Sequence, residues 1–152
     1  MPTISKFAIT DVYEGQSFNF DVAITDAIID GFAELTGDTS PLHIDDNFAI
    51  QRGFKGRVVH GALLCGLVSR LIGVHLPGQD SLLLSMNMKF PMPTYVNDLV
   101  QIKGVIDTIS LATMAITLKI EIINKQSHSI LAKGKLVVGF TVGSKFANHN
   151  PK

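Results

Sequence analysis

Alternating apolar and polar residues mark five strands, one early in the chain and four in its second half. The predicted strands cover Ser17–Ile24, Ser81–Phe90, Leu99–Ile109, Thr113–Ile123 and Ser129–Val142. The alternation has the two-residue period of a strand with one buried face. Short turn segments separate the last four strands, so these strands should pair antiparallel.

Two segments between the first and second strands have helical periodicity. Thr25 is a typical N-cap, and the helix after it should end at Gly37. Its predicted apolar side consists of Ile28, Phe32 and Leu35. The second helix, His60–His75, is apolar on most sides, which predicts that other elements surround it. Between the helices, 38–56 should be irregular, with a short helix over Asp45–Gln51.

The order of these elements predicts an α+β architecture. A curved antiparallel sheet would wrap around the long second helix, an arrangement that resembles the hot-dog fold. The sheet of a single copy would have an open edge, which favours a homodimer.

Composition and charge narrow the class of protein. With 152 residues, of which 46% are hydrophobic and 17% charged, the chain predicts one domain over 1–142 and a polar tail over 143–152. Thirteen basic residues balance 13 acidic ones, and there is no basic run, so a nucleic-acid partner is not expected.

Membrane insertion and disulfide formation are also not expected. There is no run of the ~18 apolar residues that a span needs, and the first residues do not resemble a signal peptide, which predicts a cytoplasmic protein. The single cysteine, Cys65, is interpreted as a buried packing residue. His75, His128 and His149 are scattered without ligand spacing, so no metal site is predicted.

The segment Thr36–His43 contains the first candidate chemistry. Asp38 and His43 lie in a loop after a helix, and Pro41 restricts the backbone between them. A carboxylate and an imidazole that converge can move protons on a substrate or a water molecule. Alternatively, Asp38 caps a turn and His43 is an incidental loop histidine.

The segment Gly56–Leu64 is the second candidate. It leads through His60 into the apolar helix, where the N–H of Gly61 can hold an oxygen that becomes negative. Alternatively, His60 and Gly61 simply begin a helix. Ser69 shares a face with Ala62, and it could equally be a buried serine bonded to the carbonyl of Cys65.

Basic residues near these segments are candidates for binding phosphate groups. Arg52, Lys55 and Arg57 lie next to the Asp38–His43 loop in the sequence. Lys89 and Arg70 are weaker candidates, because most such residues are ordinary surface charges.

The run Phe32–Asp45, with its Gly-Asp-Thr-Ser-Pro-Leu-His core, resembles the signature of the MaoC-like, (R)-specific enoyl-CoA hydratase family. The Val-His-Gly start of the second helix, the run His75–Phe90 and the segment Pro93–Asp98 resemble that family too. The resemblance covers roughly residues 14 to 140 and implies the hot-dog fold.

The resemblance implies a lyase of fatty acid metabolism that adds water to a trans-2-enoyl thioester, or removes it from an (R)-3-hydroxyacyl thioester. Asp38 would take a proton from the water, and His43 would position the water and relay the proton to C2. The N–H of Gly61 would stabilise the thioester oxygen, with Ser40, Ser69 and His60 in supporting roles. No cofactor is implied beyond the coenzyme A or acyl carrier of the substrate.

Two positions depart from the family pattern. Ser40 replaces the usual asparagine, and Asp46 replaces a small residue. A hydroxyl offers fewer hydrogen bonds than an amide, so Ser40 should brace the loop less well. Two other functions stay open: a hot-dog thioesterase that directs water at the thioester carbonyl, and a non-catalytic domain that binds acyl thioesters.

Overall fold

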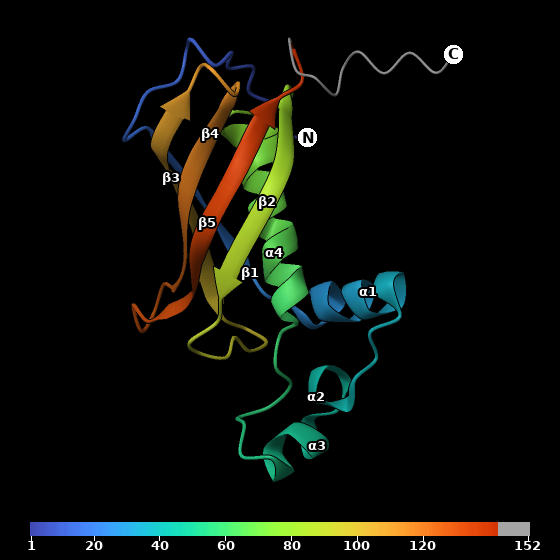
Figure 1. Ribbon diagram of the computed structural model, residues 1–152. Helices are drawn as coiled ribbons and strands as arrows, with labels where there is room; N and C mark the ends of the chain where they lie inside the picture. Colours follow the sequence, from blue (N-terminus) through green and yellow to red (C-terminus); the bar gives the residue numbers. More distant parts are fainter. Residues whose placement is uncertain (143–152) are drawn as a thin grey trace, which may run out of the picture.

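The computed structural model describes residues 1–142 and consists of one antiparallel sheet with a long helix against one face (Figure 1). The strands are β1 (Ser17–Ala23), β2 (Ser81–Lys89), β3 (Leu99–Ser110), β4 (Ala115–Asn124) and β5 (Ile130–Phe140). The five strands lie in the order β1-β3-β4-β5-β2, so β1 and β2 are the edges. The polar tail predicted over 143–152 lies outside the described residues.

The strand alternation predicts the buried face correctly. In the central strand β4, the residues that face the helix are 0–1% exposed: Ile116, Leu118, Ile120 and Ile122. Lys119 and Glu121 lie between them on the outer face and are exposed. The period of two therefore places a continuous apolar layer beneath the helix.

The central helix is α4 (Gly61–Arg70), which continues as the π-helical turn η1 (Leu71–His75). Its inner side buries Leu63, Leu64 and Val68 against the sheet. Its outer side exposes Ala62, Gly66 and Ser69, so the helix is not surrounded within one copy of the chain. The prediction of burial on most sides is wrong for this single chain, because the sheet covers only one side.

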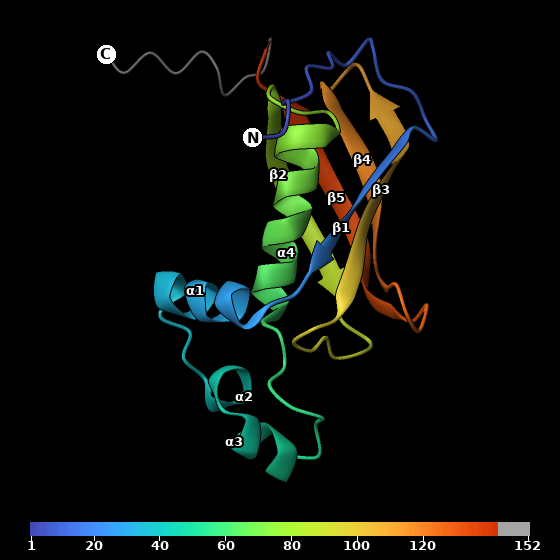
Figure 2. The same cartoon turned by 180° about the vertical axis from the view of Figure 1, so that it is seen from behind.

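Three further helices lie near or beyond the N-terminal end of α4, as both views show (Figure 2). They are α1 (Asp26–Thr36), α2 (Pro41–Ile44) and α3 (Asp46–Gln51). The short helix predicted over Asp45–Gln51 is confirmed as α3, whereas α2 was not expected within the irregular segment.

The apolar side of α1 differs from the prediction at one end. Ile29 and Ala33 are buried and Ile28 and Phe32 pack against the core, but Leu35 is 86% exposed. The helix extends away from α4 (Figure 1), so its last turn has no core to contact. Among the described residues, no helix combines the length and the apolar character that a membrane crossing requires.

Candidate active site

The loop that carries Asp38 begins where α1 ends. Gly37 has the left-handed backbone angle φ of 76° and donates its N–H to the carbonyl of Ala33 at 2.8 Å. This conformation favours glycine and turns the chain sharply. The hydroxyl of Thr36 accepts a hydrogen bond from the N–H of Asp38 at 3.2 Å. The carboxylate of Asp38 then lies exposed at the start of the loop.

A single helical turn, α2, carries His43. Pro41 occupies its first turn, where a missing N–H costs nothing. The N–H of Ser40 donates to Asp38 Oδ1 at 3.4 Å, and the carbonyl of Ser40 accepts from the N–H of His43 at 2.8 Å. The side chain of Ser40 makes no capping hydrogen bond. The backbone of Ser40, not its hydroxyl, therefore connects the two candidate residues.

The chain before α4 fixes the imidazole of His43. His43 Nδ1 donates to the carbonyl of Val58 at 2.6 Å, while the N–H of Val58 donates to the carbonyl of Leu42 at 3.0 Å. Because a carbonyl only accepts, Nδ1 carries the proton in this arrangement, and neutral His43 presents the lone pair of Nε2.

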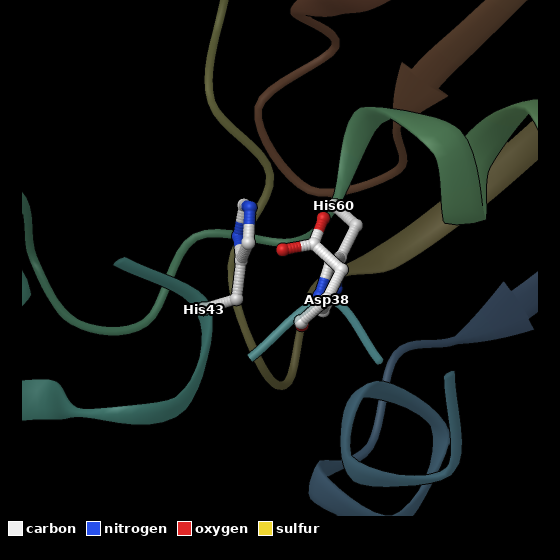
Figure 3. A group of neighbouring side chains, drawn as sticks. All are labelled: Asp38, His43 and His60. Carbon is white, nitrogen blue, oxygen red and sulfur yellow. Dashed lines mark hydrogen bonds between the residues drawn. The ribbon is translucent and has the colours of Figure 1, made fainter. Parts of the chain in front are cut away.

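His60 connects both residues and is 1% exposed. Its Nε2 donates to the backbone carbonyl of Asp38 at 3.0 Å, and its ring stacks on His43 with centroids 3.9 Å apart and planes 28° apart. Figure 3 shows the side chains of Asp38, His43 and His60 gathered at the start of α4. The sequence named His60 as a supporting residue but gave no signal for this stacking.

Gly61 begins α4 beside this group, and Phe90 covers it. A Cβ atom at Gly61 would lie 3.3 Å from Phe90 Cζ, so a larger residue here would crowd that ring. A cavity of about 370 Å³ reaches from His43 and Gly61 between apolar side chains that include Phe54, Leu64 and Met92. An acyl group can therefore approach the N-terminus of α4 through apolar surroundings.

The same residues have donor atoms that a metal ion could use. Asp38, His43 and His60 each offer one ligand atom, all within 4.8 Å of one another. The hydrogen bonds to Val58 and Asp38 occupy one nitrogen of each ring. The two rings are stacked with their planes 28° apart, and one nitrogen of each is left without a protein partner among the described residues.

Arg57 is not available for the phosphate role that the sequence suggested. Its guanidinium donates to Asp30 at 2.7 Å and also pairs with Asp26, and its side chain is only 9% exposed. The hydrogen bond to Asp30, then that to Asp26, raises the pKa of Arg57 against the opposing effect of burial. Its backbone N–H also donates to Asp46 Oδ1 at 2.9 Å, so Arg57 fastens this segment to α1 and α3.

The other basic candidates remain on the surface. Arg52 lies over the ring of Phe48 at 4.7 Å and Lys55 over Tyr95 at 5.9 Å, and both are exposed. Arg70 lies over Phe20 at 4.3 Å at the far end of α4, and Lys89 is exposed at the end of β2. Arg52 and Lys55 therefore stay the better phosphate candidates.

Two predictions for α4 need correction. Ser69 is exposed, so the alternative of a buried helix serine is wrong, and its support of the loop stays a prediction. Cys65 is partly buried rather than fully buried. Burial still raises the pKa of its thiol, which opposes formation of a nucleophilic thiolate.

Comparison with known proteins shows the family of the chain. Residues 11–122 match the model of the family described as MaoC like domain. The chain is 31% identical over 103 residues to the 3-hydroxybutyryl-CoA dehydratase of Methylorubrum extorquens, covering 68% of this chain and 66% of that protein. It is 36% identical over 90 residues to the (R)-specific enoyl-CoA hydratase of Rhodospirillum rubrum, covering 59% of this chain and 62% of that protein.

The fold is also similar to solved structures. The (R)-hydratase from A. caviae involved in PHA biosynthesis superposes with a TM-score of 0.81 at 31% identity, over 85% of this chain and 97% of that one. The predicted hot-dog fold is thereby confirmed. Because the family match covers most of the chain, this protein belongs to the MaoC-like domain family.

Proposed function

We propose that the chain catalyses the (R)-specific hydration of trans-2-enoyl-CoA to (R)-3-hydroxyacyl-CoA, or the reverse dehydration. The observation that carries this proposal is the pairing of two proton acceptors, the Asp38 carboxylate and His43 Nε2, beside the N–H groups that begin α4. The names of the hydratase and dehydratase relatives support the same chemistry.

One water molecule would supply both the hydrogen added to C2 and the hydroxyl group added to C3. Its oxygen bonds to C3 while one of its O–H bonds breaks, and Asp38 accepts that proton. His43 Nε2 accepts a hydrogen bond from the same water, which orients the oxygen lone pair toward C3. Asp38 then passes that proton to His43 Nε2, and His43 delivers it to C2 on the same face. Both residues return to their starting protonation, and H and OH are added without any oxidation or reduction.

The N–H of Gly61 would stabilise the charge that develops during addition. As the C3–O bond forms, the electrons of the C2–C3 double bond shift toward the thioester carbonyl oxygen. A donor at a helix N-terminus stabilises such an oxygen, and losing one oxyanion donor costs roughly 10²–10³-fold in kcat in other enzymes. Coenzyme A enters only as part of the substrate, with Arg52 and Lys55 as candidate contacts for its phosphates.

A homodimer would complete the surface around the site. Among the described residues, the edge strand β2 pairs only with β5, and its residues Leu82, Leu83 and Leu84 are 37–43% exposed. The outer side of α4 exposes small residues that allow close approach of a second helix. Sedimentation should therefore give twice the mass of the chain, and a stable monomer at micromolar concentration would contradict this proposal.

Purified protein mixed with crotonyl-CoA tests the activity. Loss of the enoyl absorbance without release of free coenzyme A supports the hydratase. Release of free coenzyme A indicates a thioesterase instead, and binding without turnover indicates a non-catalytic domain. The same assay with a crotonyl group on an acyl carrier protein compares the two carriers.

A cytoplasmic location stays a prediction.

A further inference from the structure

We infer that His60 is a positioning residue that holds Asp38 and His43 in one catalytic geometry, an inference that rests on the proposed function. His60 contacts both residues, although they belong to different elements. Asp38 lies in the loop after α1, whereas His43 lies in α2, and His60 immediately precedes α4. The buried end of the central helix thereby reaches both groups that would handle the proton.

The first contact fixes the backbone of Asp38. The donation from His60 Nε2 to the Asp38 carbonyl, at 3.0 Å, fastens an exposed loop to a residue that is itself buried. The other local bonds of Asp38, to the hydroxyl of Thr36 and from the N–H of Ser40, involve neighbours in the sequence that move with the loop. His60 is the contact that places Asp38 relative to α4 and Gly61.

The second contact fixes the plane of the His43 ring. The Val58 carbonyl holds one edge of the imidazole, and the face of His60 at 3.9 Å blocks its tilt. A ring flip would lose the bond to Val58, so Nε2 keeps its direction. Phe32, with its ring centroid 4.8 Å from that of His60, packs against His60 and holds it in turn.

The unpaired Nδ1 of His60 indicates that histidine is not the most stabilising residue at this position. Nδ1 is buried and has no hydrogen-bond partner among the described residues. A buried acceptor without a donor lowers stability. A phenylalanine of similar shape would keep the stacking without that cost, so a purely structural position favours phenylalanine. The histidine adds the Nε2–H donor to Asp38.

Two substitutions separate the two contacts. His60→Phe keeps an aromatic ring against His43 and loses the donor to Asp38. We expect kcat for crotonyl-CoA hydration to fall about 10- to 100-fold, since small misplacement of a reacting group has effects of this size. KM should stay within about threefold, and the melting temperature should be equal or higher. His60→Gln offers an amide donor but no ring, and its kcat should lie between that of wild type and that of His60→Phe.

Histidine NMR gives a readout that does not depend on turnover. In the wild type, the Nδ1–H of His43 should exchange slowly because it is bonded to Val58, and His43→Ala identifies its signal. The exchange should be faster in His60→Gln, which lacks the stacked ring, and unchanged in His60→Phe. Val68→Ala, in the buried face of α4, is the control for general loosening and should lower stability without lowering kcat.

Three results would overturn the inference. One is a kcat within twofold of wild type in both His60 variants. Another is a loss of kcat in both variants that is proportional to their loss of melting temperature. The third is a His43 signal in His60→Gln that exchanges as slowly as in wild type. If His60→Phe does not fold, His60→Gln decides through kcat and NMR. If wild-type protein does not hydrate crotonyl-CoA, the proposed function fails, while the NMR comparison still tests the role of His60.

Discussion

The sheet with α4 and the segment 37–60 are held together by different forces. The sheet and α4 bury continuous apolar faces, and the strand β4 alone contributes four isoleucine or leucine side chains that are at most 1% exposed. In 37–60, by contrast, only Ala49, Arg57, Val59 and His60 are buried. The hydrogen bond from His43 to the Val58 carbonyl, the hydrogen bond from His60 to the Asp38 carbonyl and the ion pairs of Arg57 hold this segment in place. Stability and chemistry should therefore respond to different substitutions.

The largest difference between the effect on activity and the effect on stability is expected at Asp38 and His43. Asp38→Asn keeps the shape of the side chain and loses a basic oxygen, and His43→Ala removes the imidazole. Each should lower kcat about 10²-fold or more, the range of general acid–base groups. The melting temperature should change little in Asp38→Asn, whose side chain is exposed, and somewhat more in His43→Ala, which loses the bond to Val58. Hydration of crotonyl-CoA at a near-wild-type rate by either variant would show that the assignment is wrong.

In the sheet, we expect a core substitution to lower stability and to leave kcat nearly unchanged. Leu118→Ala removes a fully buried side chain in β4 and should cost about 2–5 kcal/mol of unfolding free energy. The kcat per folded molecule should stay close to wild type, because Leu118 lies on the core face of the sheet. Urea unfolding and kinetics on the same sample measure both quantities. A kcat loss as large as that of Asp38→Asn would remove the distinction between the two regions.

Arg57 joins the segment 37–60 to α1, so its loss should lower stability modestly. Arg57→Met keeps much of the length of the side chain but removes the bonds to Asp26 and Asp30. The two carboxylates are 70% and 59% exposed, so water can solvate them when the partner is gone. We expect a loss of about 1–2 kcal/mol, near the value of a hydrogen bond to a charged group. An Asp26→Asn variant should lose less, because Asp30 still pairs with Arg57.

His75 tests the pH dependence of the core region. It stacks on Phe18 at 4.3 Å, and burial, aided by nearby Arg70, lowers the pKa of its imidazole. Below a pH of about 6.5 the unfolded chain binds a proton that the folded chain resists, so stability should fall as pH falls. His75→Phe keeps the stack and removes the titration. Its melting temperature should decline less than that of wild type between about pH 7.5 and 5.5, and an equal decline would exclude His75 as the cause.

The sequence predicted what local patterns determine. The strands follow from alternation, and the proximity of Asp38 and His43 follows from a short motif that spans the loop after α1 and the first turn of α2. Contacts between segments that are far apart in the sequence were harder to predict. Arg57 pairs with Asp26 and Asp30 in α1, and this pairing depends on how the helices dock rather than on spacing. The stacking of His60 on His43 depends on the same docking.

Exposure was also hard to predict at the margins of the core. Leu35 continues the apolar side of α1 but lies beyond the sheet, so helical periodicity alone placed it incorrectly. The outer side of α4 is similar, because periodicity cannot tell whether a second copy covers it. Ser40 was expected to brace the loop through its hydroxyl, and the structure gives that role to its backbone.

Ser40 provides the smallest expected effect. Its N–H and carbonyl connect Asp38 and His43, and these groups are present in any residue that adopts the same backbone. Ser40→Ala should therefore retain kcat within about twofold, since no hydrogen bond of its side chain to α2 is lost. Ser40→Asn should also stay within about threefold, because asparagine is as favourable as serine at a helix N-cap.

The Ser40 variants also test how the segment 37–60 is held together. A tenfold loss in Ser40→Ala, about 1.4 kcal/mol in the barrier, would mean that the hydroxyl contacts the substrate or a bound water. In that case the site would depend on side-chain bonds at this position as well as on backbone bonds. Kinetics of both variants on short and medium enoyl thioesters separate these possibilities, because a substrate contact changes the preference between chain lengths and a bracing contact lowers both rates equally.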